Sequence, residues 1–155
     1  MKEYVIFSDG PDMTRKLGYR LGLVLKKDDV LLLDGDLGAG KTCLTQGIAE
    51  AIGIKEPASS PTYNLVNEYV GGDFSLYHYD VYRLSSADEL LDIGFEENLG
   101  EGVIVVEWAV NTEGCFPADS IRIFIERMDD IGAEKRKIIM NIDEERGDSI
   151  VNSLS

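Results

Sequence analysis

Apolar and polar residues alternate along the chain with two periodicities, about 3.6 residues in helices and 2 residues in strands, and these periodicities predict its elements. From Met13 to Leu25 the leucines and valine recur at helical spacing, which predicts an amphipathic helix with Asp12 as its N-cap. Two further helices are expected at 43–52 and 144–154, and a capping box predicts a short one at 86–93. Alternating or continuous apolar runs predict strands at 2–8, 30–33, 62–70, 74–81, 103–106, 121–126 and 137–142.

The order of these segments predicts an α/β fold in three layers with a mixed parallel and antiparallel central sheet. The run Val103–Val106 has no polar residue and is expected to be a central strand buried on both faces. The turn Gly71-Gly72-Asp73 joins two expected strands as a hairpin, so part of the sheet should be antiparallel. No repeat or linker interrupts the chain, and residues 1–155 are interpreted as one domain.

A glycine-rich segment at 35–42, Gly-Asp-Leu-Gly-Ala-Gly-Lys-Thr, fits the phosphate-loop pattern G-x-x-x-x-G-K-[ST]. It lies between an expected strand and an expected helix, which is the context that such a loop requires. The glycines allow backbone N–H groups to converge on an anion at the start of the helix. The segment therefore predicts a P-loop NTPase fold, with nucleotide phosphates bound by Gly35, Gly38, Ala39, Gly40, Lys41, Thr42 and Cys43.

A nucleoside triphosphatase also needs a carboxylate at the end of a neighbouring strand to hold Mg²⁺. Asp80 ends one expected strand and Glu107 ends another, and both are candidates for the metal site together with the Thr42 hydroxyl. Asp80 could instead cap the next turn, and Glu107 could instead position the attacking water. The only tryptophan, Trp108, could be a core anchor or a functional residue, and the only histidine, His78, is expected to be structural.

The net charge of −14 limits the partners of this chain. Its basic residues are scattered, so tight direct binding of nucleic acid is not expected. We expect contact with proteins instead, although acidity also serves solubility. No apolar run is long enough to span a membrane or to resemble a secretion signal, which predicts a cytoplasmic protein. Two cysteines do not make a disulfide framework.

Four segments occur in an order that resembles the TsaE (YjeE) family. They are the phosphate loop at 35–42, Ser-Pro-Thr-Tyr-Asn-Leu-Val at 60–66, His-Tyr-Asp-Val-Tyr-Arg-Leu at 78–84 and Glu-Trp at 107–108. The resemblance implies an ATPase of tRNA threonylcarbamoyladenosine biosynthesis that is weak alone, uses ATP and Mg²⁺, and docks on the TsaD and TsaB proteins. Tyr63 and Cys43 are mild departures from the family pattern.

The resemblance also implies roles for individual residues. Lys41, Asp80, Glu107 and Thr62 would be catalytic, with Thr62 as a switch threonine that senses the γ-phosphate. Thr42 and Glu107, with Asp80, would form the metal site. Thr14 and Arg136 are the residues we expect to contact adenine. The hypothesis is a nucleotide-gated switch, in which ATP orders the loop around Thr62 and hydrolysis releases or resets the partner.

Three other classes of protein remain open from the residues alone. A small-molecule kinase also uses a phosphate loop, but the seven arginines are scattered and form no obvious lid. A GTPase would carry an Asn-Lys-x-Asp segment, which is missing from the sequence. A non-catalytic module could bind nucleotide for structural reasons only.

Overall fold

The computed structural model describes residues 1–36, 38–56, 58 and 65–154. The seven strands within these residues belong to one sheet, in the order β1-β7-β6-β2-β5-β4-β3. Their bounds are β1 Lys2–Ser8, β2 Val30–Gly35, β3 Val66–Tyr69, β4 Ser75–Asp80, β5 Gly102–Glu107, β6 Ile121–Arg127 and β7 Arg136–Ile142. The longer helices are α1 Pro11–Val24, α2 Lys41–Ala51 and α5 Glu144–Leu154, and the short ones are α3 Ala87–Asp92, α4 Phe95–Asn98 and the 3-10 helix η1 Ala109–Thr112.

The predicted mixed sheet is confirmed. The middle strands β6, β2, β5 and β4 are parallel neighbours, whereas β7 and β1 on one side and β3 on the other pair antiparallel. The hairpin expected between β3 and β4 is present, with Val66 opposite Tyr79. As a consequence, the carboxyl ends of β2, β5 and β4 lie side by side at one edge of the sheet.

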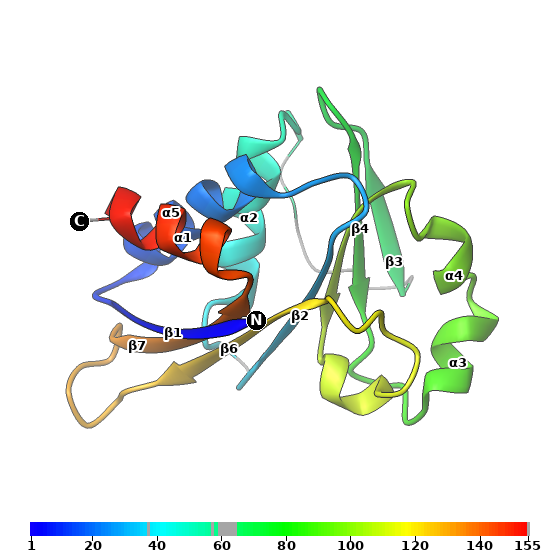
Figure 1. The fold of residues 1–155 in the computed structure, drawn as a ribbon. Coiled ribbons are helices and arrows are strands. Elements are labelled where there is room, and N and C mark those ends of the chain that lie inside the picture. The colour runs from blue at the N-terminus through cyan, green and yellow to red at the C-terminus, as the bar shows by residue number, and fades with distance from the viewer. Residues whose placement is uncertain (37, 57, 59–64, 155) are drawn as a thin grey trace.

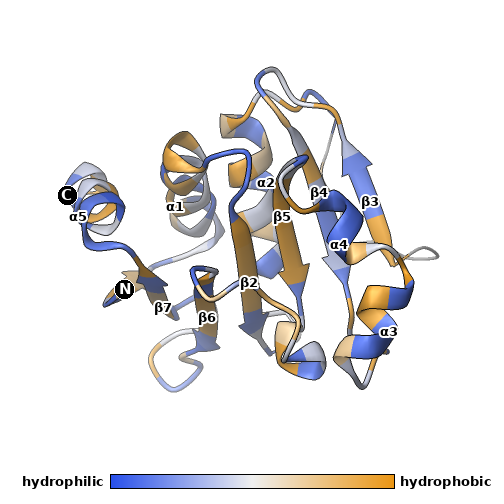
Figure 2. Ribbon diagram, turned by 45° about the vertical axis from the view of Figure 1, so that its right-hand side comes forward, coloured by the Kyte–Doolittle hydropathy of each residue, from blue (hydrophilic) through white to orange (hydrophobic). Residues whose placement is uncertain are grey.

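Helices cover both faces of the central strands, as Figure 1 shows. The helices α1, α2 and α5 lie over one face, and α3, α4 and η1 lie over the other face near β4 and β5. Side chains of β2 alternate between the two cores, with Leu31 and Leu33 on one side and Leu32 on the other. The central strands β2 and β5 are correspondingly apolar over most of their length in Figure 2, with Asp34 and Glu107 near their carboxyl ends. Every residue of β5 is buried, as its continuous apolar run predicts.

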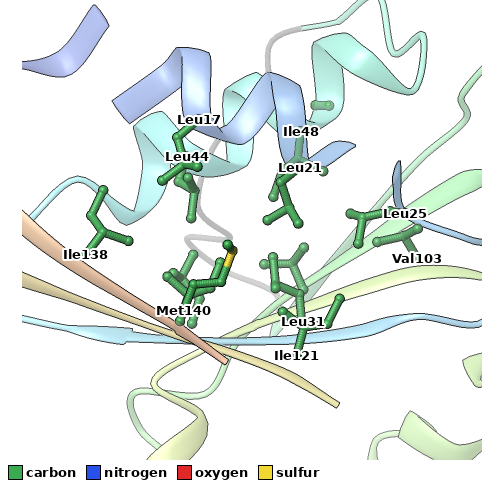
Figure 3. Packing of buried hydrophobic residues seen from close by; sticks show 14 of the residues in the cluster. Leu17, Leu21, Leu25, Leu31, Leu44, Ile48, Val103, Ile121, Ile138 and Met140 are labelled. Atoms are coloured by element: carbon green, nitrogen blue, oxygen red, sulfur yellow. The ribbon is translucent and has the colours of Figure 1, made fainter. Parts of the chain in front are cut away.

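The larger core lies between the helix pair α1–α2 and the sheet. Leucines from α1, among them Leu17 and Leu21, point toward Leu31 and Met140 of the sheet (Figure 3). Each fully buried leucine contributes about 1.5–3 kcal/mol of hydrophobic stabilisation. This packing fixes α2 against the sheet and so determines where the loop that precedes α2 lies.

Helix α1 differs at its start from the sequence prediction. It begins at Pro11 with Gly10 as the N-cap residue, so the prediction of Asp12 as N-cap is wrong. Proline suits the first helical position because its fixed φ is helical and its missing N–H would have no partner there. Asp12 lies instead in the first turn, where its negative charge interacts favourably with the helix dipole and stabilises the helix. Of the helices within the described ranges, none combines the length and apolar character that crossing a bilayer requires.

Candidate nucleotide site

The phosphate loop joins β2 to α2 in the conformation that its glycines allow. Gly38 and Gly40 have φ values of 77° and 116°, in the region that favours glycine. Gly40 is the N-cap of α2, and its carbonyl accepts the Leu44 N–H at 3.0 Å. The loop therefore turns sharply enough for α2 to begin at Lys41, two residues earlier than the sequence pattern predicts.

Lys41 is buried although it carries a charge, with only 6% of the residue exposed. Its ammonium group donates to the carbonyl oxygens of Gly35 and Asp36, the second at 3.1 Å. It also lies 4.1 Å from the centre of the Trp108 ring, within the range of a cation–π interaction. The sequence left open whether Trp108 is a core anchor or a functional residue, and the structure shows that it contacts Lys41 of the candidate site.

Burial lowers the pKa of Lys41, because it removes water from the ammonium group. The carboxylates of Glu107, Asp80, Asp34 and Asp36 act in the opposite direction and favour the charged form, in that order of strength. Since several acids surround a single buried cation, a bound phosphate would need further positive charge to offset them.

Glu107 and Asp80 occupy opposite positions on the paired strands β5 and β4. Glu107 is 3% exposed, and its carboxylate is hydrogen-bonded to Nε2 of the fully buried His78. Burial raises the pKa of Asp80, whereas its hydrogen bond from the Tyr82 N–H, at 3.1 Å, works against this rise. Asp80 therefore does make the turn contact that we considered as the alternative to a metal role.

A pocket of about 220 Å³ opens beside the phosphate loop. Thr14 and Arg136, the two residues expected at adenine, both line it, together with Gly38, Gly40 and Cys43. Arg136 donates from Nε to the Ala39 carbonyl at 2.8 Å and from Nη2 to the Gly38 carbonyl at 3.3 Å. The Thr14 hydroxyl lies 2.8 Å from that of Ser8. The structure thus brings Thr14 and Arg136 together, from opposite ends of the sequence.

The sequence prediction did not include two residues near the site, Glu134 and Asp34. Glu134 lines the same pocket from the β6–β7 loop, and the chain carries no local signal for this placement. Asp34 accepts the Val110 N–H at 3.1 Å and is close enough to Lys41 to affect its pKa. Its position at the end of the β2 strand could have indicated it. Thr62, the predicted switch threonine, lies outside the described residues.

The described part of the chain holds no ready-made cluster of three His, Cys, Asp or Glu side chains for a metal ion. Magnesium in nucleotide sites commonly uses only one or two protein ligands besides phosphate oxygens and water. Thr42 at the start of α2, with Glu107 and Asp80 at neighbouring strand ends, is a donor set of that kind. The magnesium site remains a prediction.

The fold and the loop together define a class. The chain is an α/β protein of the P-loop type, in which a glycine-rich loop connects a central parallel strand to a helix. The family model described as "Threonylcarbamoyl adenosine biosynthesis protein TsaE" matches residues 8–138. The chain belongs to the TsaE family.

Individual relatives agree with this assignment. The chain is 38% identical over 156 residues to the tRNA threonylcarbamoyladenosine biosynthesis protein TsaE of Bacillus subtilis, covering 100% of this chain and 96% of the relative. The protein of the same description from Nostoc sp. is 44% identical over 108 residues, or 67% of each chain. Among solved structures, that of Bacillus subtilis YdiB matches with a TM-score of 0.76 at 31% identity, covering 99% of this chain and 94% of that one.

Proposed function

We propose that this chain binds ATP with Mg²⁺ and hydrolyses it, as the nucleotide-dependent component of tRNA threonylcarbamoyladenosine biosynthesis. In this proposal it acts on the TsaD and TsaB proteins, and its weak turnover rises when they are present. The main support for the proposal is that Lys41, at the start of α2, lies near Glu107 and Asp80 at the ends of neighbouring strands. The names of the relatives, which refer to this tRNA modification, support the biological process.

The residues of the candidate site fit a nucleoside triphosphate. Burial disfavours the charged form of Lys41, and a phosphate anion beside it would favour that form again. In this proposal the ammonium group exchanges its backbone acceptors for phosphate oxygens, and the amides of the loop and of the first turn of α2 bind the same anion. Thr14 and Arg136 would line the base-binding side, where the pocket of about 220 Å³ lies.

The acidic residues would have separate tasks. When bound, Mg²⁺ would neutralise part of the phosphate charge, and Thr42 with Asp80 or Glu107 would hold it. Glu107, buried at the end of β5, would orient the attacking water or share in that metal site. Partner stimulation fits the balance of charge around Lys41, because the partner could supply a cation for the developing negative charge.

The experiment is ATP turnover by the chain, alone and with TsaD and TsaB, next to tRNA modification in the same mixture. We expect stimulated turnover, and its loss in Lys41→Ala but not in Lys135→Ala, since Lys135 makes an exposed ion pair with Asp9. Normal tRNA modification by Lys41→Ala, with no stimulation of the unmodified protein, would contradict the proposal.

The same preparation separates the rival classes. Phosphate transfer to a member of a metabolite panel would indicate a kinase, and stronger competition by GTP than by ATP would indicate a GTPase. Copurification of the chain with TsaD and TsaB should differ between ATP and ADP. Unchanged tRNA modification by Glu107→Ala would favour a non-catalytic module.

A further inference from the structure

We infer that His78 is a positioning residue, which holds the Glu107 carboxylate in the orientation that ATP hydrolysis needs. This inference rests on the function proposed above and assigns a task to a side chain that the sequence suggested was only structural. It depends on the contact between the His78 ring and the Glu107 carboxylate.

The backbone places the two side chains together. Strands β4 and β5 are parallel neighbours, and His78 lies opposite Val105, two positions before the pair Asp80–Glu107. Glu107 is the last residue of β5 and lies between Leu33 of β2 and Asp80 of β4. A glutamate side chain can adopt several rotamers, and a contact from the neighbouring strand restricts that choice.

The ring of His78 supplies that contact from inside the fold. His78 is 0% exposed and Glu107 is 3% exposed, so water does not compete for the bond between them. A carboxylate accepts hydrogen bonds, and therefore the His78 Nε2 carries the hydrogen that points at Glu107.

The other ring nitrogen gives a second, independent observation. Nδ1 of His78 is buried without a hydrogen-bond partner among the described residues. A histidine kept only for packing could be replaced by an apolar side chain and would avoid this cost. The structure instead retains a buried polar ring with one nitrogen on Glu107, which is typical of a residue that orients a functional group.

Two substitutions at His78 separate positioning from packing. His78→Leu fills the space but donates no hydrogen bond, whereas the terminal amide of His78→Gln can replace the Nε2 donor. We expect His78→Leu to lower ATP turnover about tenfold or more, the range found when partners of functional ligands are removed. Nucleotide affinity should stay within about twofold, and His78→Gln should recover most of the turnover.

Leu76→Ala is the matched control, because Leu76 is a fully buried residue of the same strand. It should lower the melting temperature but leave turnover per folded molecule unchanged. Turnover of His78→Leu within twofold of the unmodified protein, or equal impairment of His78→Gln and His78→Leu, would overturn the inference. A fall in affinity as large as the fall in turnover would also overturn it.

A spectroscopic measurement tests the contact without activity. His78 is the only histidine, so its ring nitrogens give a single set of NMR signals. Glu107→Gln should shift the Nε2 signal, whereas Glu113→Gln, which alters an exposed carboxylate, should not. An unchanged Nε2 signal in Glu107→Gln would show that the contact is absent. If the unmodified protein has no ATP turnover even with TsaD and TsaB, the proposed function fails, and the positioning role fails with it.

Discussion

The ammonium group of Lys41 lies over the ring of Trp108, 4.1 Å from its centre. The backbone explains this arrangement. Trp108 has a φ of 63°, the one positive value among the non-glycine residues that the structure describes, and its N–H donates to the Leu33 carbonyl at 3.0 Å. This conformation turns the chain after β5 into η1, where the Val110 N–H donates to Asp34 of β2. The single tryptophan is therefore in contact with the lysine of the phosphate loop.

ATP binding should change the fluorescence of Trp108, because the proposed movement of Lys41 toward phosphate alters the charge beside the indole ring. Since this is the only tryptophan, all indole emission comes from the site. A titration with ATP and Mg²⁺ should give a saturable change that is lost in Lys41→Ala. Binding seen by calorimetry with no change in emission would argue against the movement of Lys41.

Replacing Arg136 by alanine should weaken nucleotide binding about tenfold. Its guanidinium group donates to two carbonyls of the phosphate loop from a partly exposed position. Hydrogen bonds to charged groups contribute about 1.5–3 kcal/mol, and the lower end of that range, which suits partial exposure, corresponds to about tenfold. Arg122→Ala is the control, since Arg122 pairs with Glu113 on the surface. Calorimetry gives both affinities, and equal values for the two variants would refute the role of Arg136.

Alanine at Gly47 should destabilise the fold by about 1–3 kcal/mol, the usual cost of overpacking. A Cβ atom on Gly47 would collide with the Arg15 carbonyl oxygen of α1, so the two helices would have to separate. Gly72→Ala is the matched control, because a Cβ atom there has its nearest neighbour at 3.9 Å. Thermal unfolding should show a clear drop for Gly47→Ala alone.

Asp34→Asn should modestly stabilise the nucleotide-free protein at neutral pH, because it removes a charge that burial disfavours. Burial raises the folded pKa of Asp34 above its usual value of 3.8, so the fold favours the neutral form. The stability linked to that proton is fully present below the unfolded pKa and is lost as the pH rises through the folded pKa. The asparagine remains neutral throughout, and its amide oxygen can still accept the Val110 N–H.

Thermal unfolding across a range of pH checks this direction of the pH dependence of stability. The advantage of Asp34→Asn should be largest at neutral pH and should vanish below about pH 3.8, the usual value for an aspartate. Asp36→Asn is the comparison at an exposed position two residues away. If the stability advantage of Asp34→Asn grew in acid instead, burial of the Asp34 charge would not be its cause.

The sequence by itself determined the strands, the longer helices, α3 and the phosphate loop, because these depend on local chemistry, whereas the short helices α4 and η1 were not predicted. Alternation of apolar residues along β6, the continuous apolar run of β5 and the glycines of the loop each act within a few residues. It also indicated that the sheet is mixed, through the turn between β3 and β4. The capping of α1 could not be read in the same way, because Asp12 and Gly10 are both acceptable N-cap residues.

Only the tertiary structure decided which side chains meet. The contacts of His78 with Glu107, of Lys41 with Trp108 and of Arg136 with the phosphate loop join residues 29, 67 and 97 or more positions apart. They depend on strand order and on one unusual φ value at Trp108. Apart from the β3–β4 hairpin, local pattern carries no information on which strands are neighbours, since the same apolar runs satisfy many strand orders. The observed order is one that buries both faces of the central strands at once.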